Sequence, residues 1–85
     1  MHPAQVAELI RKAMPDAEVK VESDDQTHFS ARIVSAAFAG LRGVARHQIV
    51  YRSLGALVGR EIHALSIEAL TPQEAATRSP GLPQP

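Results

Sequence analysis

The sequence predicts a small α+β domain in which helices pack on one face of a three-stranded sheet. Two patterns support this fold class. Apolar residues recur at helical spacing over residues 3–15 and 44–58, and they alternate with polar residues over 17–23, 27–35 and 61–70. The chain has 85 residues, which suits one domain with a thin core. The predicted order of helix, strand, strand, helix, strand and short helix is typical of a sheet covered by one helical layer.

The first helix is predicted over residues 3–15. Pro3 suits its first position, because a proline has no N–H that would be left unpaired there. Pro15 ends the helix, because the residue before a proline is pushed out of the helical conformation. One apolar stripe follows this helix: Val6, Leu9, Ile10, Ala13 and Met14.

Two strands follow, and they are close enough in sequence to form a hairpin. Residues 17–23 and 27–35 alternate in polarity, and the intervening DDQ, residues 24–26, has the composition of a turn. The apolar side of the second strand contains Phe29, Ala31 and Ile33. Its wetter side is expected to contain Thr27, Arg32 and Ser35.

A glycine-containing turn, residues 36–43, leads into a long helix from Val44 to about Val58, with Gly59 as its stop. At about 100° per residue, one face of this helix is apolar. That face is expected to hold Val44, Val50, Tyr51, Leu54, Leu57 and Val58, with His47 among them. The opposite side is expected to hold Arg42, Arg46, Arg52 and Arg60.

The third strand is predicted over residues 61–70. Its apolar content favours a central place in the sheet, and it is expected to pair with an edge of the hairpin after the long helix crosses over. Alternation places His63 on the same side as Leu65 and Ile67, where a buried strand would otherwise carry an apolar residue.

A short last helix is predicted over residues 72–78. The preceding TPQE, residues 71–74, is a capping box in which the threonine caps, the proline takes the first position and the glutamate reaches back. The folded domain is therefore expected to span residues 1–78. The final segment, residues 79–85, is expected to be a disordered tail.

Charge and composition exclude several classes of protein. Nine basic and nine acidic residues cancel, which argues against a surface that binds nucleic acid over its whole area. The chain has no cysteine, so it cannot use disulfides or hold an iron–sulfur cluster with its own thiolates. We find neither a signal peptide nor a run near the roughly 18 apolar residues of a membrane span, so a cytoplasmic location is expected.

The sequence does not predict an enzyme. Glu61 and His63 share one side of the third strand, whereas Ser66 lies on the other, so no nucleophile stands beside a base. No motif for cradling phosphate or transferring hydride is present.

The histidines are candidate metal ligands: His2, His28, His47 and His63. His28 begins the second strand and His63 the third, so they meet at one end of the sheet if these strands are parallel neighbours. Two imidazoles are too few for a closed tetrahedral site, so further ligands would have to come from another molecule. A structural role in the core is the alternative for an isolated histidine on an apolar face.

Nucleic-acid binding is a further interpretation. The GLRG segment, residues 40–43, matches the GxxG loop with which KH domains clamp a nucleotide backbone. With the basic helix face it gives these candidate contacts: Gly40, Arg42, Gly43, Arg46 and Arg52. A solvated basic face would carry the same pattern.

Taken together, these motifs resemble the BolA-like family, and within it the short YrbA/IbaG-type subgroup. The resemblance covers about residues 3–75. The matching segments are THF at 27–29, FAG at 38–40, RH at 46–47, VY at 50–51, IHAL at 62–65 and TP at 71–72.

This resemblance implies a class II KH-like fold, αββααβ, in a cytoplasmic bacterial protein that is monomeric or weakly dimeric. It implies a non-enzymatic partner of monothiol, CGFS-type glutaredoxins, active in iron–sulfur trafficking or iron regulation. The two proteins and glutathione would share a [2Fe–2S] cluster, and the chain would bind none alone. The family also includes members linked to stress response and to DNA-binding transcriptional regulation, which is the alternative function.

The resemblance also implies which residues act. His63, in the IHAL segment, corresponds to the recurrent cluster ligand of the family. Many members carry a second ligand in a longer loop between the first two strands, but here that loop is SDDQ, residues 23–26, without histidine or cysteine. His28 is the nearest candidate, although it matches the strand-start position of the family and not its loop ligand. His47 is expected to support packing or an interface.

Overall fold

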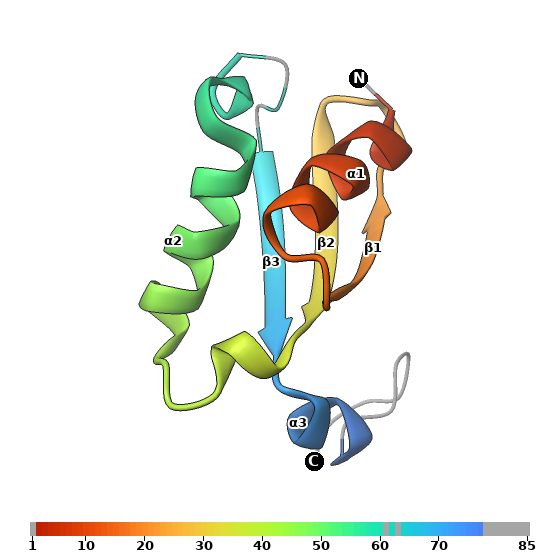
Figure 1. Ribbon diagram of the computed structural model, residues 1–85. Coiled ribbons are helices and arrows are strands. Elements are labelled where there is room, and N and C mark those ends of the chain that lie inside the picture. Colours follow the sequence, from red (N-terminus) through yellow and green to blue (C-terminus); the bar gives the residue numbers. More distant parts are fainter. Residues whose placement is uncertain (1, 61, 63, 78–85) are drawn as a thin grey trace.

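The computed structural model describes residues 2–60, 62 and 64–77 (Figure 1). Its elements are α1 (Pro3–Ala13), β1 (Glu18–Glu22), β2 (His28–Val34), the 3₁₀ helix η1 (Ala36–Phe38), α2 (Gly43–Leu54), the 3₁₀ helix η2 (Gly55–Leu57), β3 (Ala64–Leu70) and α3 (Pro72–Thr77). This order and the three-stranded sheet confirm the predicted α+β class. The predicted tail, residues 79–85, lies outside the described residues.

The central strand of the sheet is β2. It runs antiparallel to β1 and parallel to β3, with His28 opposite Ala64 at one end and Val34 opposite Leu70 at the other. The third strand therefore pairs with an edge of the hairpin, as predicted, but the prediction that it is central was wrong. The strand order β1-β2-β3 places β3 at an edge. Its residues alternate between exposed and half-buried up to Leu70, which is buried.

The core lies between the sheet and helices α1 and α2, which cover the same face (Figure 1). Its buried residues are Val6, Ala7, Ile10, Met14, Val19, Phe29, Ala31, Ile33, Phe38, Val50, Leu54 and Ile62. The predicted stripe of the first helix is largely confirmed, although Ala13 is exposed and Ala7 takes a place in the core. On the opposite face of the sheet, small and charged residues such as Ser30, Ala64 and Lys20 are exposed, whereas Val34 and Leu70 at the carboxyl end are buried.

Helix α2 is shorter than predicted and is rotated relative to the predicted face. It ends at Leu54 because Gly55 adopts a φ of 57°, a left-handed conformation that favours glycine. Val50 and Leu54 are buried, whereas Val44 and Tyr51 are exposed by 74% and 39%. The predicted apolar face was therefore wrong at Val44 and Tyr51, and also at Val58, which lies beyond the end of the helix and is exposed.

The chain turns at the carboxyl ends of β2 and β3, and polar side chains form hydrogen bonds at both turns. Ser35, which we expected on the wetter side, is buried; its hydroxyl donates to Asp16 Oδ2 (3.1 Å) and accepts from the Ala37 N–H (3.1 Å). The predicted capping box is confirmed, since Thr71 Oγ1 accepts from the Glu74 N–H and Glu74 Oε1 accepts from the Thr71 N–H.

Candidate functional site

The loop between β1 and β2 is tied to the first residue of β2. Ser23 Oγ donates to the His28 carbonyl (2.6 Å) and accepts from the Gln26 N–H (2.9 Å). Asp25 Oδ1 accepts from the N–H groups of Thr27 (2.9 Å) and His28 (2.8 Å). Gln26 bridges the turn with a φ of 62°. These contacts fix the backbone from which the His28 side chain projects.

The side chains of Asp25 and His28 also contact each other. His28 Nδ1 lies 2.6 Å from Asp25 Oδ2, and the two side chains are 66% and 52% exposed. The backbone N–H of His28, its ring and the Thr27 N–H hold the pKa of the Asp25 carboxyl well below its usual range. No described residue bonds Nε2 of His28, and the side chain that carries this nitrogen is largely exposed.

The strand register defines the surroundings of His28. Its partner on β3 is Ala64, and the next open-face pair, Ser30 and Ser66, is also small and exposed. The sequence placed His28 and His63 at one end of the sheet on the condition that their strands are parallel neighbours. Strands β2 and β3 are parallel neighbours, so this condition is fulfilled. His63 itself lies outside the described residues. Ala64, which follows it in the sequence, is the residue beside His28.

The other two histidines lie elsewhere. His2 precedes α1, and its backbone N–H donates to Gln5 Oε1 (2.9 Å). His47 is half-buried on α2, among residues whose side chains reach solvent. Within residues 2–60, 62 and 64–77, no three histidine, cysteine or acidic side chains gather into a metal site. An ion at His28 would therefore need ligands from beyond the described residues.

The predicted basic face contains two kinds of arginine. Arg42, which caps the start of α2, and Arg52, within α2, are exposed. Gly40 has a φ of 79° and Gly43 begins the helix, and a Cβ at either would meet nothing within 4 Å. The GLRG segment is therefore open to solvent.

Arg46 does not belong to this exposed set. Its side chain is 13% exposed. It donates to the carbonyls of Leu41 (2.9 Å) and Ala69 (2.9 Å) and forms a two-pronged ion pair with Glu74, at 2.6 and 3.3 Å. Its guanidinium also lies 5.9 Å from the Phe38 ring centroid. The expectation that Arg46 faces solvent opposite the apolar residues was wrong, since its guanidinium is occupied within the domain.

Sequence reasoning missed the burial of Arg46 and the contact between Asp25 and His28, and the sequence contains only a partial signal for each. Arg46 precedes Val50 by four residues, so the two lie on one helix face. Asp25 precedes His28 by three residues in a tight turn, a spacing at which an aspartate caps the following N–H groups. The sequence indicated a turn there but not the contact between the carboxylate and the imidazole.

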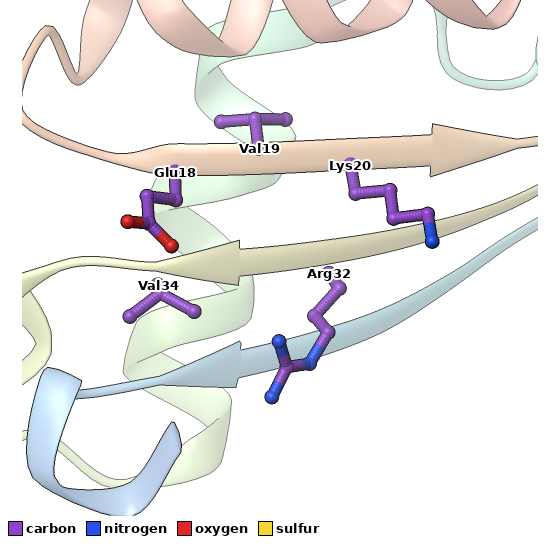
Figure 2. A pocket seen from close by; sticks show the side chains of 5 residues that line it. All are labelled: Glu18, Val19, Lys20, Arg32 and Val34. Atoms are coloured by element: carbon purple, nitrogen blue, oxygen red, sulfur yellow. The ribbon is translucent and has the colours of Figure 1, made fainter. Parts of the chain in front are cut away.

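A shallow depression of about 180 Å³ lies over β1 and β2, away from His28. Figure 2 shows its lining residues: Glu18, Val19, Lys20, Arg32 and Val34. Arg32 pairs with Glu68 across β2 and β3 (2.9 Å), and Lys20 pairs with Glu22 (3.3 Å). Because the cations already have acidic neighbours, we assign no ligand to this depression.

Comparison with known proteins identifies the family. The sequence model of the BolA-like proteins matches residues 4–74. The chain belongs to the BolA-like family. The resemblance recognised in the sequence is therefore confirmed.

Individual BolA-like proteins show how far the likeness extends. The chain is 41% identical over 75 residues to an uncharacterized protein in the rpoN-murA intergenic region of Acinetobacter guillouiae, covering 87% of this chain and 89% of that protein. This relative of similar length fits the short YrbA/IbaG-type subgroup. The chain is 44% identical over 54 residues to the DNA-binding transcriptional regulator BolA of Vibrio cholerae, covering 64% of this chain but only 51% of the regulator.

A solved structure supports the same fold. The bolA protein homologue from Coxiella burnetii superposes with a TM-score of 0.79 at 30% identity, covering 92% of this chain and 99% of that one. Among the described residues, no helix combines the length and the hydropathy required to cross a bilayer.

Proposed function

We propose that this BolA-like protein is a non-enzymatic partner of a monothiol glutaredoxin and supplies histidine to a shared [2Fe–2S] cluster, in iron–sulfur trafficking or iron regulation. One observation supports the proposal: the exposed His28 lies at the same end of the parallel pair β2 and β3 as Ala64, the residue that follows His63. His28 projects from the open face of the sheet, and alternation predicts His63 on the other face, so a shared cluster would have to lie at the end of the strands. His63 is the principal ligand in this proposal, and His28 is the second nitrogen donor.

The chemistry of the available donors supports this role. The chain has no cysteine, so it can offer a cluster only imidazole nitrogen, and the partner and glutathione would supply thiolates. A neutral imidazole in place of a thiolate makes the cluster less negative, which raises its reduction potential. The bacterial cytoplasm keeps the partner's thiols reduced and is the compartment in which we place the complex.

We place the contact with the partner protein on the exposed side of α2. Val44, His47 and Tyr51 are spaced three and four residues apart, so they follow one another along the helix. Val44 and Tyr51 are large apolar side chains that the domain leaves exposed. Exposed apolar side chains next to a half-buried histidine suit a protein interface, with His47 supporting the contact.

Visible circular dichroism of a [2Fe–2S]-loaded monothiol glutaredoxin tests the proposal. Titration with the wild-type chain should change the spectrum and reach saturation, and titration with His2→Ala, a matched control, should do the same. His63→Ala should abolish the change, and His28→Ala should shift the spectrum. An unchanged spectrum with wild type, or wild-type behaviour of His63→Ala, would contradict the proposal.

Nucleic-acid binding is a second candidate, favoured by the regulator's name in Vibrio cholerae and by the open GLRG segment. Its contacts would come from Arg42 and Arg52 with Gly40 and Gly43, without Arg46. Affinity for duplex DNA should then fall with salt, with a logarithmic slope of about −0.9 per neutralised phosphate.

Gly43→Asp is the discriminating variant for this candidate. Gly43 is the first residue of α2 and has room for a Cβ, so the fold should tolerate an aspartate there. The added negative charge should abolish binding to DNA while leaving the glutaredoxin titration unchanged. DNA affinity equal to wild type would exclude the GLRG segment as a phosphate clamp.

A further inference from the structure

We propose that Asp25 is a positioning residue that holds His28 with its proton on Nδ1 and its lone pair on Nε2, so that Nε2 is ready to bind a metal. This inference deepens the proposed function and rests on it only for the identity of the metal. The tautomer can be tested without any partner.

The Asp25 carboxylate has little freedom to turn. Its Oδ1 already accepts from the N–H groups of Thr27 (2.9 Å) and His28 (2.8 Å). Its Oδ2 is left facing Nδ1 of His28 at 2.6 Å. Ser23 holds both ends of the same turn, through the Gln26 N–H and the His28 carbonyl.

The Asp25 carboxylate determines which ring nitrogen of His28 carries the proton. An ionised carboxylate can only accept, so a nitrogen at hydrogen-bond distance from it must carry hydrogen. A neutral imidazole has one N–H, and once that N–H is on Nδ1, Nε2 must be an acceptor. Histidines that ligate metals are commonly oriented in this way, with the second nitrogen donating to a carboxylate.

The Nε2 nitrogen of His28 is accessible to another molecule. The His28 side chain is 66% exposed, and no described residue bonds its Nε2. The neighbouring open-face residues Ser30, Ala64 and Ser66 are small. An ion held by another molecule can therefore approach this nitrogen without displacing any of these described side chains.

A role for Asp25 in the turn alone is the competing explanation, and Asp25→Asn separates the two. The asparagine keeps an oxygen for the Thr27 and His28 N–H groups, but it presents an amide N–H₂ to Nδ1 of His28. Nδ1 must then accept, and the proton moves to Nε2. Asp24→Asn is the matched control, because it removes the same charge from the adjacent exposed position.

Long-range ¹H–¹⁵N correlation spectra of the histidine rings measure the tautomer directly. At a pH where the imidazoles are neutral, wild type and Asp24→Asn should show His28 protonated on Nδ1, and Asp25→Asn should show it protonated on Nε2. An Nε2–H tautomer in wild type would overturn the proposal. So would an unchanged tautomer in Asp25→Asn, because Asp25 would then act on the turn alone.

Titration of the same samples with NiCl₂ measures the consequence for metal binding, because imidazole is a suitable ligand for nickel. We expect the affinity at His28 to fall about tenfold in Asp25→Asn relative to Asp24→Asn, in line with the loss of an outer-shell carboxylate. Equal affinities in the two variants would refute the positioning role. If the tautomer and nickel results hold while the glutaredoxin spectrum does not change, Asp25 keeps its role and only the proposed partner is excluded.

Discussion

The two ends of the parallel pair β2 and β3 differ in how they are closed. At the carboxyl end the Ser35 N–H donates to the Leu70 carbonyl (2.9 Å), and Arg46 and α3 cover the strand ends. At the amino end, His28 and its neighbour Ala64 are exposed. As far as the described residues define them, we call the carboxyl end of this pair the sealed end and the amino end the open end.

Each end contains a cation-forming side chain 2.6 Å from a carboxylate: Arg46 with Glu74, and His28 with Asp25. The difference is solvent exposure, 13% for the Arg46 side chain and 66% for His28. Glu74 is 40% exposed, so removing Arg46 mainly takes a largely buried donor away from two backbone carbonyls. At the exposed pair of His28 and Asp25, water can replace either partner. We infer that the sealed end contributes to stability and the open end to function.

The largest expected effect is at the sealed end. Arg46→Ala should destabilise the domain by about 2–3 kcal/mol, because it removes the hydrogen bonds that the guanidinium donates to the Leu41 and Ala69 carbonyls and to Glu74. Urea unfolding measures this. Arg52→Ala, an exposed position on the same helix, should change stability by less than about 0.5 kcal/mol. Equal effects of the two substitutions would show that the buried contacts do not stabilise the fold.

The capping box at the same end should have a smaller effect. Thr71→Ala removes the hydroxyl that accepts from the Glu74 N–H and should cost about 1 kcal/mol. Gln73→Ala, on the exposed side of α3, serves as the control in the same unfolding experiment. If Thr71→Ala is as stable as Gln73→Ala, α3 does not contribute to closing this end.

Stability at the open end should increase when the strained turn is relaxed. Gln26 has a φ of 62°, where a side chain is unfavourable and glycine is not. Gln26→Gly should therefore stabilise the domain by about 0.5 kcal/mol, after the larger entropy of glycine in the unfolded chain is subtracted. Gln26→Ala should give no such gain. A lower melting temperature for the glycine variant would show that the turn is not strained.

The smallest effect on stability is expected at His28. Because its side chain is exposed, His28→Ala should shift the melting temperature by less than about 3 °C. A shift comparable to that of Arg46→Ala would remove the distinction between the two ends and return His28 to a structural role.

The helices, the strands and the cap were readable from the sequence because they depend on local patterns. The TPQE cap and Pro3 are examples, since each acts within a few residues. The edge position of β3 was not readable, because it depends on which strand supplies a hydrogen-bonding partner. The burial of Arg46 depends in the same way on Ala69 of β3 and Glu74 of α3, which are 23 and 28 residues away.

The candidate site likewise contains features that could be predicted from the sequence and one that could not. The sequence identified the exposed His28 and the open GLRG segment, and the family resemblance supplied His63, which lies outside the described residues. The role of Asp25 could not be predicted, because a carboxylate in a turn gives the same sequence signal whether or not it contacts an imidazole. Coordinates were needed to show the 2.6 Å separation.

Pulsed electron paramagnetic resonance tests most directly whether the open end binds a cluster. The chain is labelled with ¹⁵N-histidine, mixed with the [2Fe–2S]-loaded glutaredoxin and reduced. We predict a ¹⁵N hyperfine coupling from this chain that disappears in His63→Ala and changes in His28→Ala. A complex that forms without any histidine nitrogen coupling from this chain would contradict it.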